Sequence, residues 1–293
     1  MRNTASEFHE NRLRFSLGLR SNPSMPTPMR NMRNKTSLLS IILCFFLLFP
    51  AVSQAESFTV EAIIEEEKLS ASFEMIEIPG KNYALGKTEV TCEVYEIVMG
   101  ENPSSYAEGN FPVNTVNWYD CIVFCNKLSL LLGKIPVYSV NGSVNPDDWD
   151  YSPHGGSAIT GEIVCHIRAD GFRLPTVEEW EYSASGGQNF KYSGSDNLSE
   201  VAWFKDNSEY KSHEVATKAP NAYGLYDMSG NLWEWCWDRF KEDSNYYRVH
   251  KGGSSASGKE LCEIQFTGHH YGSRYQPCYS YYTFGFRIAR NLR

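Results

Sequence analysis

The sequence beyond residue 55 lacks two features: an apolar run long enough to cross a membrane, and a cluster of basic side chains. The first absence argues against a membrane-spanning domain in that part of the chain. The formal charge of the whole chain is −8; because its first 55 residues carry seven Lys/Arg against two Glu, the remainder carries −13. A body this acidic repels nucleic acids and anionic membrane surfaces, so neither is expected as a partner.

The sequence also lacks the cysteine pattern of a disulfide framework or a zinc site. Seven cysteines follow residue 55, an odd number, so at least one thiol has no partner within the chain. Cys121 and Cys125 lie four positions apart on an expected helix, where a disulfide is awkward, and no CxxC spacing occurs. We therefore expect apolar packing to stabilise a single domain at 56–293, since 42% of the residues are hydrophobic.

The N-terminus has the pattern of an export signal. An apolar run of about 15 residues follows Lys35, the length of a signal-peptide core rather than of a full membrane span. Small residues occupy Ser53 and Ala55, the two positions that a signal peptidase reads. We expect 1–55 to be an export region, with the mature protein in the periplasm or at the cell surface.

Two alternatives concern the same region. Met29 or Met32 would be a more usual start, because the residues before them are out of place ahead of a signal peptide. Cys44 offers a lipid anchor, the only membrane attachment that the sequence suggests, although Leu43 matches a lipid-attachment box poorly.

Secondary structure is predicted at a few well-marked places. Three segments begin with a capping residue, and the third has a capping box formed by Thr176 and Glu179. The predicted helices are 92–99, 118–132 and 177–185. Alternation predicts a strand at 73–78, and we expect the stretch 137–171, rich in Gly, Ser, Asn and Asp, to form a hairpin-like insertion.

Tryptophan is concentrated in one block, where Trp233, Trp235 and Trp237 fall within five residues. We expect Trp180, Trp233 and Trp235 to be buried, because dense tryptophan can anchor a fold that has little regular structure. We interpret Glu234 as a buried carboxylate held by hydrogen bonds rather than as a catalytic or metal-binding group.

The segment from Lys251 to Arg287 has an unusual composition. Its 31 residues from Ser254 to Phe284 include five Tyr, five Ser and three Gly but only two large aliphatics. No run in it keeps the period of a strand or a helix. Tyr, Ser and Gly are favoured in antibody-like binding surfaces, and long irregular segments are usually functional. The composition predicts a ligand-binding segment displayed on a rigid scaffold.

The polar and aromatic side chains of this segment are the candidate ligand-binding residues, expected to cluster on one exposed face. Leu261, Ile264 and Phe286 are expected to point inward. The candidates are Ser255, Ser257, Lys259, Glu263, Gln265, Thr267, His269, His270, Ser273, Tyr275, Gln276, Tyr279, Ser280, Tyr281 and Tyr282.

Five sequence blocks identify a family resemblance. FPVNTVNWYDCIVFCNKL, GFRLPTVEEWEYSASGG, NAYGLYDMSGNLWEW, RVHKGGS and GFRIAR occur in this order. Together they resemble the sulfatase-modifying-factor family, the formylglycine-generating-enzyme-like domains, over about residues 73–290. The resemblance implies an α+β, C-type-lectin-like fold that is compact and has much irregular structure.

The resemblance implies one of two functions. Some members are copper-dependent oxidases that convert a sulfatase cysteine to formylglycine with two cysteines five positions apart. Here Cys262 matches the second position but Ser257 the first, and a hydroxyl is a poor ligand for copper(I). Other members are variable proteins of diversity-generating retroelements, of a treponemal type, in which the segment between GGS and the final GFR is diversified and binds ligand.

We favour the second kind of member, with the oxidase as the alternative, because the tyrosine-rich segment is present and the first thiol is absent. The expected partner is a protein or another cell-surface ligand, and no catalytic residue is assigned. The family also implies structural calcium in many members, for which Asn231 and Glu234 could supply oxygen atoms.

Two further motifs in the segment are incomplete. Cys262, His269, His270 and Cys278 have the atom types of a metal site, but their spacing meets no known rule. The stretch 253–259 matches the first seven positions of a phosphate-binding loop, yet Glu260 replaces the Ser or Thr that would hold Mg²⁺.

Overall fold

The computed structural model describes residues 53–64, 66–105, 107–242, 245–268 and 281–292. The N-terminal apolar run and Cys44 lie outside these residues, and their roles stay predictions. Among the residues that the structure describes, no helix is both long and apolar enough to cross a membrane.

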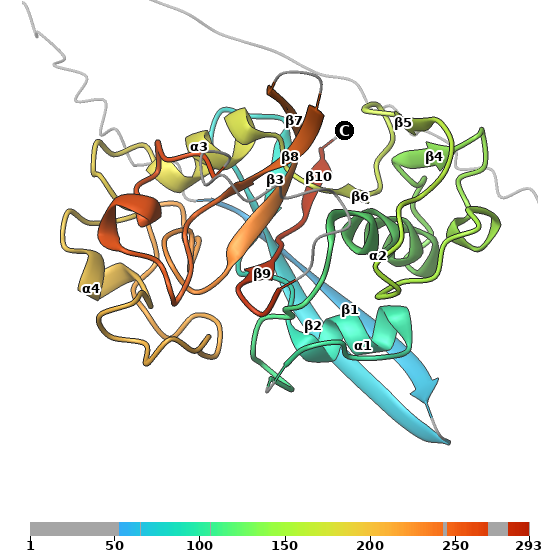
Figure 1. Cartoon of the computed structure of the whole chain (residues 1–293), viewed down its shortest axis with the longest axis horizontal. Coiled ribbons are helices and arrows are strands. Elements are labelled where there is room, and N and C mark those ends of the chain that lie inside the picture. Colours follow the sequence, from blue (N-terminus) through green and yellow to red (C-terminus); the bar gives the residue numbers. More distant parts are fainter. Residues whose placement is uncertain (1–52, 65, 106, 243–244, 269–280, 293) are drawn as a thin grey trace, which may run out of the picture. The chain divides into compact units, whose positions relative to one another are not determined.

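The largest sheet has five antiparallel strands. In spatial order they are β1 (Ala55–Ile64), β2 (Glu67–Glu77), β3 (Tyr83–Gly86), β10 (Ala289–Asn291) and β6 (Phe172–Arg173). The long β1–β2 ribbon pairs from Ala55 with Ile76 to Ile64 with Glu67 (Figure 1). The predicted strand at 73–78 is only the end of β2, because most residues of the ribbon before it are exposed or half-buried and give a weak apolar period.

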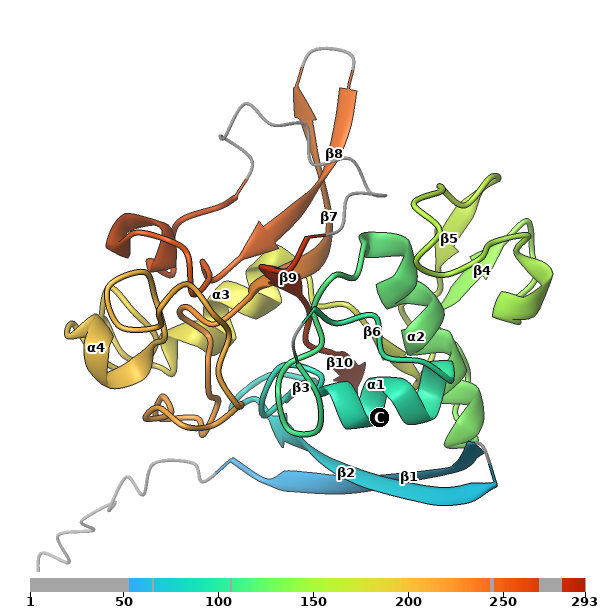
Figure 2. The same cartoon turned by 60° about the horizontal axis from the view of Figure 1, so that its bottom comes forward.

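The helices follow the capping signals closely. They are α1 (Cys92–Met99), α2 (Trp118–Leu131), α3 (Val177–Ser185) and α4 (Leu198–Val201), with single 3-10 turns η1 (Pro146–Asp148) and η2 (Lys259–Cys262). The predicted capping box of α3 is present, since Thr176 accepts from the Glu179 amide and Glu179 from the Thr176 amide. Helix α1 lies against the β1–β2 ribbon (Figure 2).

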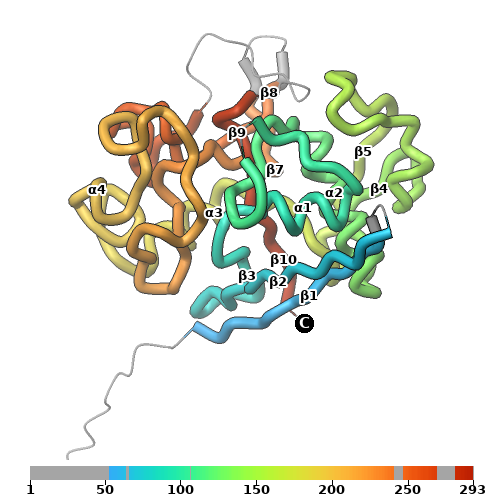
Figure 3. Tube along the Cα trace, turned by 90° about the horizontal axis from the view of Figure 1, so that it is seen from below, coloured from blue at the N-terminus to red at the C-terminus, as the bar shows by residue number. Residues whose placement is uncertain are grey.

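Two smaller sheets complete the fold. Strands β4 (Tyr138–Val140) and β5 (Ile163–Cys165) form the hairpin predicted within 137–171. A three-stranded sheet has the order β8 (Asn245–Lys251), β7 (Trp233–Glu242) and β9 (Phe284–Gly285), with β7 and β9 parallel. The β4–β5 hairpin and the α4 region lie at opposite ends of the described part (Figures 1 and 3).

The tryptophans occupy the core, as predicted. Trp180, Trp233 and Trp235 are 0%, 7% and 0% exposed. The indole of Trp235 donates to the carbonyl of Val116 at 3.1 Å, and that of Trp118 to the carbonyl of Cys236 at 2.9 Å. Because these N–H groups find main-chain acceptors, the rings can be buried without leaving an unpaired donor.

The cysteines of the described part form no disulfide. Six are present as free thiols, and five of these are buried. They act there as small apolar side chains, which agrees with the expectation that packing rather than cross-linking stabilises the domain.

Candidate ligand-binding site

Both ends of the candidate segment are attached to the same strand. In β7, Glu234 pairs with Lys251 of β8 on one side and with Gly285 of β9 on the other. Since neighbouring strands lie about 4.8 Å apart, the segment leaves and rejoins the sheet at points about 10 Å apart. The scaffold therefore closes the segment into a loop with fixed ends.

Two glycines turn the chain sharply at the start of this loop. Gly252 and Gly253 have φ angles of +93° and +78°, in the left-handed region that glycine adopts most readily. A Cβ atom on Gly253 would lie 2.7 Å from the sulfur of Cys262. The GGS block is thus explained by local geometry: the turn brings the chain back against η2.

Two of the candidate residues are not at the surface. Ser255 and Ser257 are 1% and 3% exposed, so the expectation that their side chains face solvent is wrong. The amide of Ser255 donates to the carbonyl of Asn231 at 2.8 Å, and the Ser257 hydroxyl accepts from the amide of Ser254 at 2.9 Å. The Ser257 hydroxyl thus satisfies the main chain of a tight turn, a role of serine that composition does not distinguish from display, whereas Ser255 is held through its main chain.

The middle of the described loop mixes exposed and anchored side chains. Lys259 and Gln265 are exposed. Glu263 is half-buried and forms an ion pair of 2.8 Å with Lys191. The hydroxyl of Thr267 accepts from the buried ammonium of Lys251 at 3.3 Å, so Glu263 and Thr267 also hold the loop to the scaffold.

The expected inward-facing residues behave largely as predicted. Ile264 and Phe286 are 4% and 0% exposed, whereas Leu261 is only half-buried. Seven candidates, together with Cys278, lie outside the described residues. These are His269, His270, Ser273, Tyr275, Gln276, Tyr279 and Ser280.

The C-terminal end of the loop presents two exposed tyrosines beside a cavity. Tyr281 and Tyr282 are 45% and 38% exposed, and their ring centroids lie 4.2 Å apart. Tyr282 lines a cavity of about 670 Å³ whose other walls come from Ser105, Phe111, Asn114 and residues 209–212. This volume lies within the range of small-molecule sites, about 300–1,000 Å³.

Residues distant in sequence complete this cavity, and the sequence did not identify them. Tyr210 is 53% exposed and has a φ angle of +62°, which is rare for a residue other than glycine. Phe111, Asn114 and Lys211 contribute an aromatic ring, an amide and a cation. The only sequence feature that points to these residues is the loop-rich composition of 188–220. Composition does not show which other loop this stretch contacts.

The two positions of the oxidase thiols do not fit a copper(I) centre. Ser257 replaces one thiol, and its hydroxyl is engaged by the Ser254 amide. Cys262 is fully buried, and burial raises the pKa of its thiol to about 12. Copper(I) prefers paired soft thiolates, and with Ser257 at the first position these two positions offer only one sulfur.

A buried charge cluster lies below the loop. Glu234 is fully buried; both of its carboxylate oxygens accept from Arg287, at 2.6 and 2.7 Å, and one also accepts from the Trp180 indole at 2.6 Å. Arg287 is fully buried too. The prediction of a buried carboxylate with an indole donor is confirmed, with Arg287 rather than the main chain supplying the other hydrogen bonds. This pair ties the end of the loop to β7 and α3.

The expectation that Asn231 and Glu234 supply a calcium site does not fit this geometry. The Asn231 side-chain oxygen accepts from the amide of His213 at 2.9 Å, and the Glu234 oxygens are taken by Arg287 and Trp180. Within the described ranges, no group of three or more His, Cys, Asp or Glu side chains is placed to hold a metal ion.

Two further acids surround Arg287, so the cluster holds more carboxylates than cations. Glu89 and Asp227 are each 2% exposed. Burial, together with repulsion from Asp227 and Glu234, raises the pKa of Glu89 well above its ordinary range. Burial also raises the pKa of Asp227 from 3.8 to about 6, against the opposing effect of the Ala216 amide.

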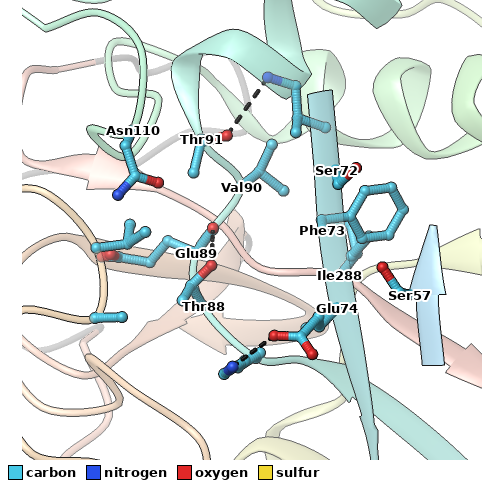
Figure 4. A pocket seen from close by; sticks show the side chains of 15 residues that line it. Ser57, Ser72, Phe73, Glu74, Thr88, Glu89, Val90, Thr91, Asn110 and Ile288 are labelled. Carbon is cyan, nitrogen blue, oxygen red and sulfur yellow. Dashed lines mark hydrogen bonds and ion pairs between the residues drawn. The ribbon is translucent and has the colours of Figure 1, made fainter. Parts of the chain in front are cut away.

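Glu89 also lines a cavity of about 390 Å³ between the β1–β2 ribbon and the stretch 86–91 (Figure 4). Two of its lining residues, Lys87 and Glu74 of β2, form an ion pair of 2.5 Å. The Glu89 carboxylate accepts from the Asn231 side chain at 2.8 Å and from the Leu232 amide at 3.0 Å. Because these donors directly precede β7, we interpret Glu89 as part of the buried charge cluster.

The Asp227 carboxyl should give the protein a pH-dependent stability. Its folded pKa lies above its unfolded value, so the folded state binds the proton more tightly, and stability falls as pH rises from about 4 to about 6. We expect Asp227→Asn, which keeps an oxygen for the Ala216 amide, to gain up to about 2–3 kcal/mol relative to the original protein over this range. Urea unfolding at a series of pH values measures the slope.

The exposed Asp206→Asn variant is the matched control for this experiment and should leave the slope unchanged. Glu89 still titrates in the Asp227→Asn variant, so a flatter curve is expected rather than a level one. Identical slopes for Asp227→Asn and the original protein would show that Asp227 is ionised in the folded state throughout this range.

The described part is thus an α+β domain with mixed sheets and few helices, in which a loop with fixed ends is attached to a buried charge cluster. The family model for the sulfatase-modifying factor enzyme 1-like domain matches residues 56–292, and the chain belongs to this family. Its fold is the formylglycine-generating-enzyme type of C-type-lectin-like fold, as expected from the five sequence blocks.

Similar proteins include a variable protein, a chaperone and an enzyme. Treponema denticola variable protein 1 has a similar structure, with a TM-score of 0.64 and 32% identity, covering 80% of this chain and 99% of that chain. Chaperone protein LppX of Paenibacillus barcinonensis is 35% identical over 210 residues, 64% of this chain and 74% of the relative. The formylglycine-generating enzyme of Streptomyces coelicolor is 32% identical over only 94 residues, 30% of its own length.

Proposed function

We propose that the chain is a ligand-binding protein. Its binding surface comprises the exposed part of the loop between Lys251 and Arg287 and the cavity that Tyr282 lines. The observation that supports this most directly is that two exposed tyrosines, Tyr210 and Tyr282, line this cavity, while the exposed ring of Tyr281 packs against that of Tyr282.

The chemistry of the cavity supports recognition of a mixed polar and apolar ligand. Tyrosine offers a large, stiff contact area and a hydroxyl, and exposed aromatics often dominate binding energy. Asn114 and Lys211 add hydrogen-bond donors beside the rings. Because the ends of the loop are fixed by β7 and by the Glu234–Arg287 pair, changes at its exposed positions need not disturb the core.

The proposal extends to export, surface display and diversification of the loop. Export is supported by the N-terminal sequence pattern, and diversification by the family resemblance together with the similarity to the treponemal variable protein. The diversification part can be tested on DNA: a near-copy of the coding segment for the loop, differing only at adenines, should lie near a reverse transcriptase gene. A single unvaried copy with no such neighbour would contradict it.

The binding surface is tested by removing its three exposed aromatics together. Ligands would be selected from a phage-displayed random peptide library with the original protein as bait. We expect the triple variant Tyr210→Ala, Tyr281→Ala, Tyr282→Ala to bind the selected peptides at least about tenfold more weakly, since aromatic anchors often contribute more than about 1 kcal/mol each. Titration calorimetry measures the affinity, and thermal unfolding checks that the fold is kept.

The matched control is Phe190→Ala, which removes an aromatic ring with the same 38% exposure as Tyr282 from outside this cavity. It should leave peptide binding unchanged. Equal binding by the triple variant would place the binding surface elsewhere. Conversion of a sulfatase-type peptide to formylglycine that is lost in Cys262→Ser would replace the binding function with the oxidase alternative.

A further inference from the structure

A third cavity lies on another part of the molecule, lined by the β7–β8 hairpin, the start of α2 and residues 159–163. Its volume is about 310 Å³, and it shares no lining residue with the cavity at Tyr282. Two arginines, Arg239 of β7 and Arg248 of β8, contribute the only charged side chains of its lining.

The two arginines face the same side of the hairpin. They are direct register partners in the antiparallel pair of β7 and β8, so their side chains leave the same face of the ribbon. Like charges in this arrangement destabilise a sheet. The repulsion between the two arginines therefore lowers the stability of the folded protein, and a bound anion would relieve it.

Arg248 is held as a rigid, nearly buried cation. It is 4% exposed, and its guanidinium carbon lies 3.5 Å from the centroid of the Trp118 ring and 5.0 Å from that of Trp237. One nitrogen donates to the carbonyl of Trp237 at 2.6 Å. Arg248 lines the cavity, and none of its nitrogens is both sealed from solvent and without a partner.

No carboxylate of the described residues forms an ion pair with Arg239 or Arg248, although the charge of Asp238 acts on Arg248. The arginines that form ion pairs there are Arg173, Arg287 and Arg290. The nearby Asp238 accepts instead from the amide of Val177 at 2.7 Å. Burial, and then the charge of Arg239, lower the pKa of Arg248 to about 9, which still leaves it cationic at neutral pH.

We propose that this cavity is an anion-binding site for a small ligand that has a carboxylate- or phosphate-type head and a short apolar body. The planar guanidinium groups of Arg239 and Arg248 match the geometry of such oxyanions. Tyr119, Tyr247, Ile159 and Ile163 form the wall against which the apolar body packs. This site is independent of the binding surface proposed at Tyr282.

Calorimetric titration with phenyl phosphate and with benzoate tests the site in the full chain. Saturable binding of either is expected, and the preferred probe tells a phosphate-type head from a carboxylate. Added salt should weaken binding, because ion pairs are screened. Benzyl alcohol, which has the ring without the charge, should not bind.

The decisive variant is Arg239→Gln, since Arg239 is exposed and its removal leaves the stacked Arg248 in place. Binding is expected to weaken about tenfold or more, as for the loss of a charge-assisted hydrogen-bond donor, while the melting temperature without ligand stays equal or rises. A merely structural Arg239 would instead lower the melting temperature. The exposed Arg168→Gln is the control and should bind as the original protein does.

The proposal is overturned if neither probe binds, or if Arg239→Gln binds as tightly as the original protein. Equal weakening in Arg168→Gln would also overturn it, because that result would mean nonspecific attraction of anions. Binding here that persists in the triple tyrosine variant would confirm that the two sites are separate.

Discussion

Replacing Arg287 with methionine is expected to lower the free energy of unfolding by about 3–5 kcal/mol, the usual cost of breaking a buried ion pair. Arg287 is the cation that pairs with Glu234 in the cluster, and Glu89 and Asp227 are buried within its field. Attraction to Glu234 raises the pKa of Arg287 although burial acts in the opposite direction. Methionine keeps part of the side-chain volume but leaves the carboxylates without a counter-charge.

A double variant distinguishes the effect of losing the Arg287 charge from the effect of losing its side-chain volume. Glu234→Gln combined with Arg287→Met removes the unpaired charge and keeps an oxygen acceptor for the Trp180 indole, so it should be less destabilised than Arg287→Met alone. Urea unfolding measures each difference.

The exposed Arg168→Met is the control for this series and should change stability by no more than about 0.5 kcal/mol. A loss below about 1 kcal/mol in Arg287→Met would contradict the view that this pair holds the end of the loop.

Replacing Trp233 with alanine is expected to cost about 3–5 kcal/mol, as for other truncations of core aromatics. Trp233 is 7% exposed, its ring lies 4.6 Å from that of His250 between centroids, and its amide donates to the carbonyl of Thr283 at 2.9 Å. Its ring also lies 6.0 Å from that of Phe266, within the candidate loop. The truncation therefore opens a cavity between the scaffold and the loop.

Trp233→Phe is the matched variant for this prediction. It retains an aromatic ring against His250 and should lose clearly less stability than Trp233→Ala. The midpoint and slope of urea unfolding give both values. If alanine costs less than about 1 kcal/mol, the tryptophan block is not the anchor of the fold.

The residues that stabilise the fold are different from the exposed residues that we propose bind ligand. Glu234 and Trp233 belong to β7, the strand to which both ends of the loop are attached. Exposed positions such as Gln265 and Lys259 contribute little packing, so they can change at small cost to stability. This division explains how one scaffold can carry a changeable surface.

The sequence by itself determined the features whose causes are local. Capping residues such as Thr176 and Asn117 located the helices, since a cap acts on amides only two or three positions away. The density of tryptophan predicted the buried block, and the five sequence blocks predicted the family. Ser257 at the first thiol position argued against the oxidase before any geometry was known.

Only the tertiary structure decided the features that depend on contacts between distant segments. The order β8-β7-β9 closes the loop, yet its two partner strands are separated along the chain by the loop itself. The burial of Ser255 follows from a contact with Asn231, and the cavity at Tyr282 needs Tyr210 from another loop. Likewise, Arg239 and Arg248 lie side by side only because β7 and β8 pair in this register. Composition and periodicity describe neighbours along the chain, whereas these contacts arise from the packing of segments that the sequence keeps apart.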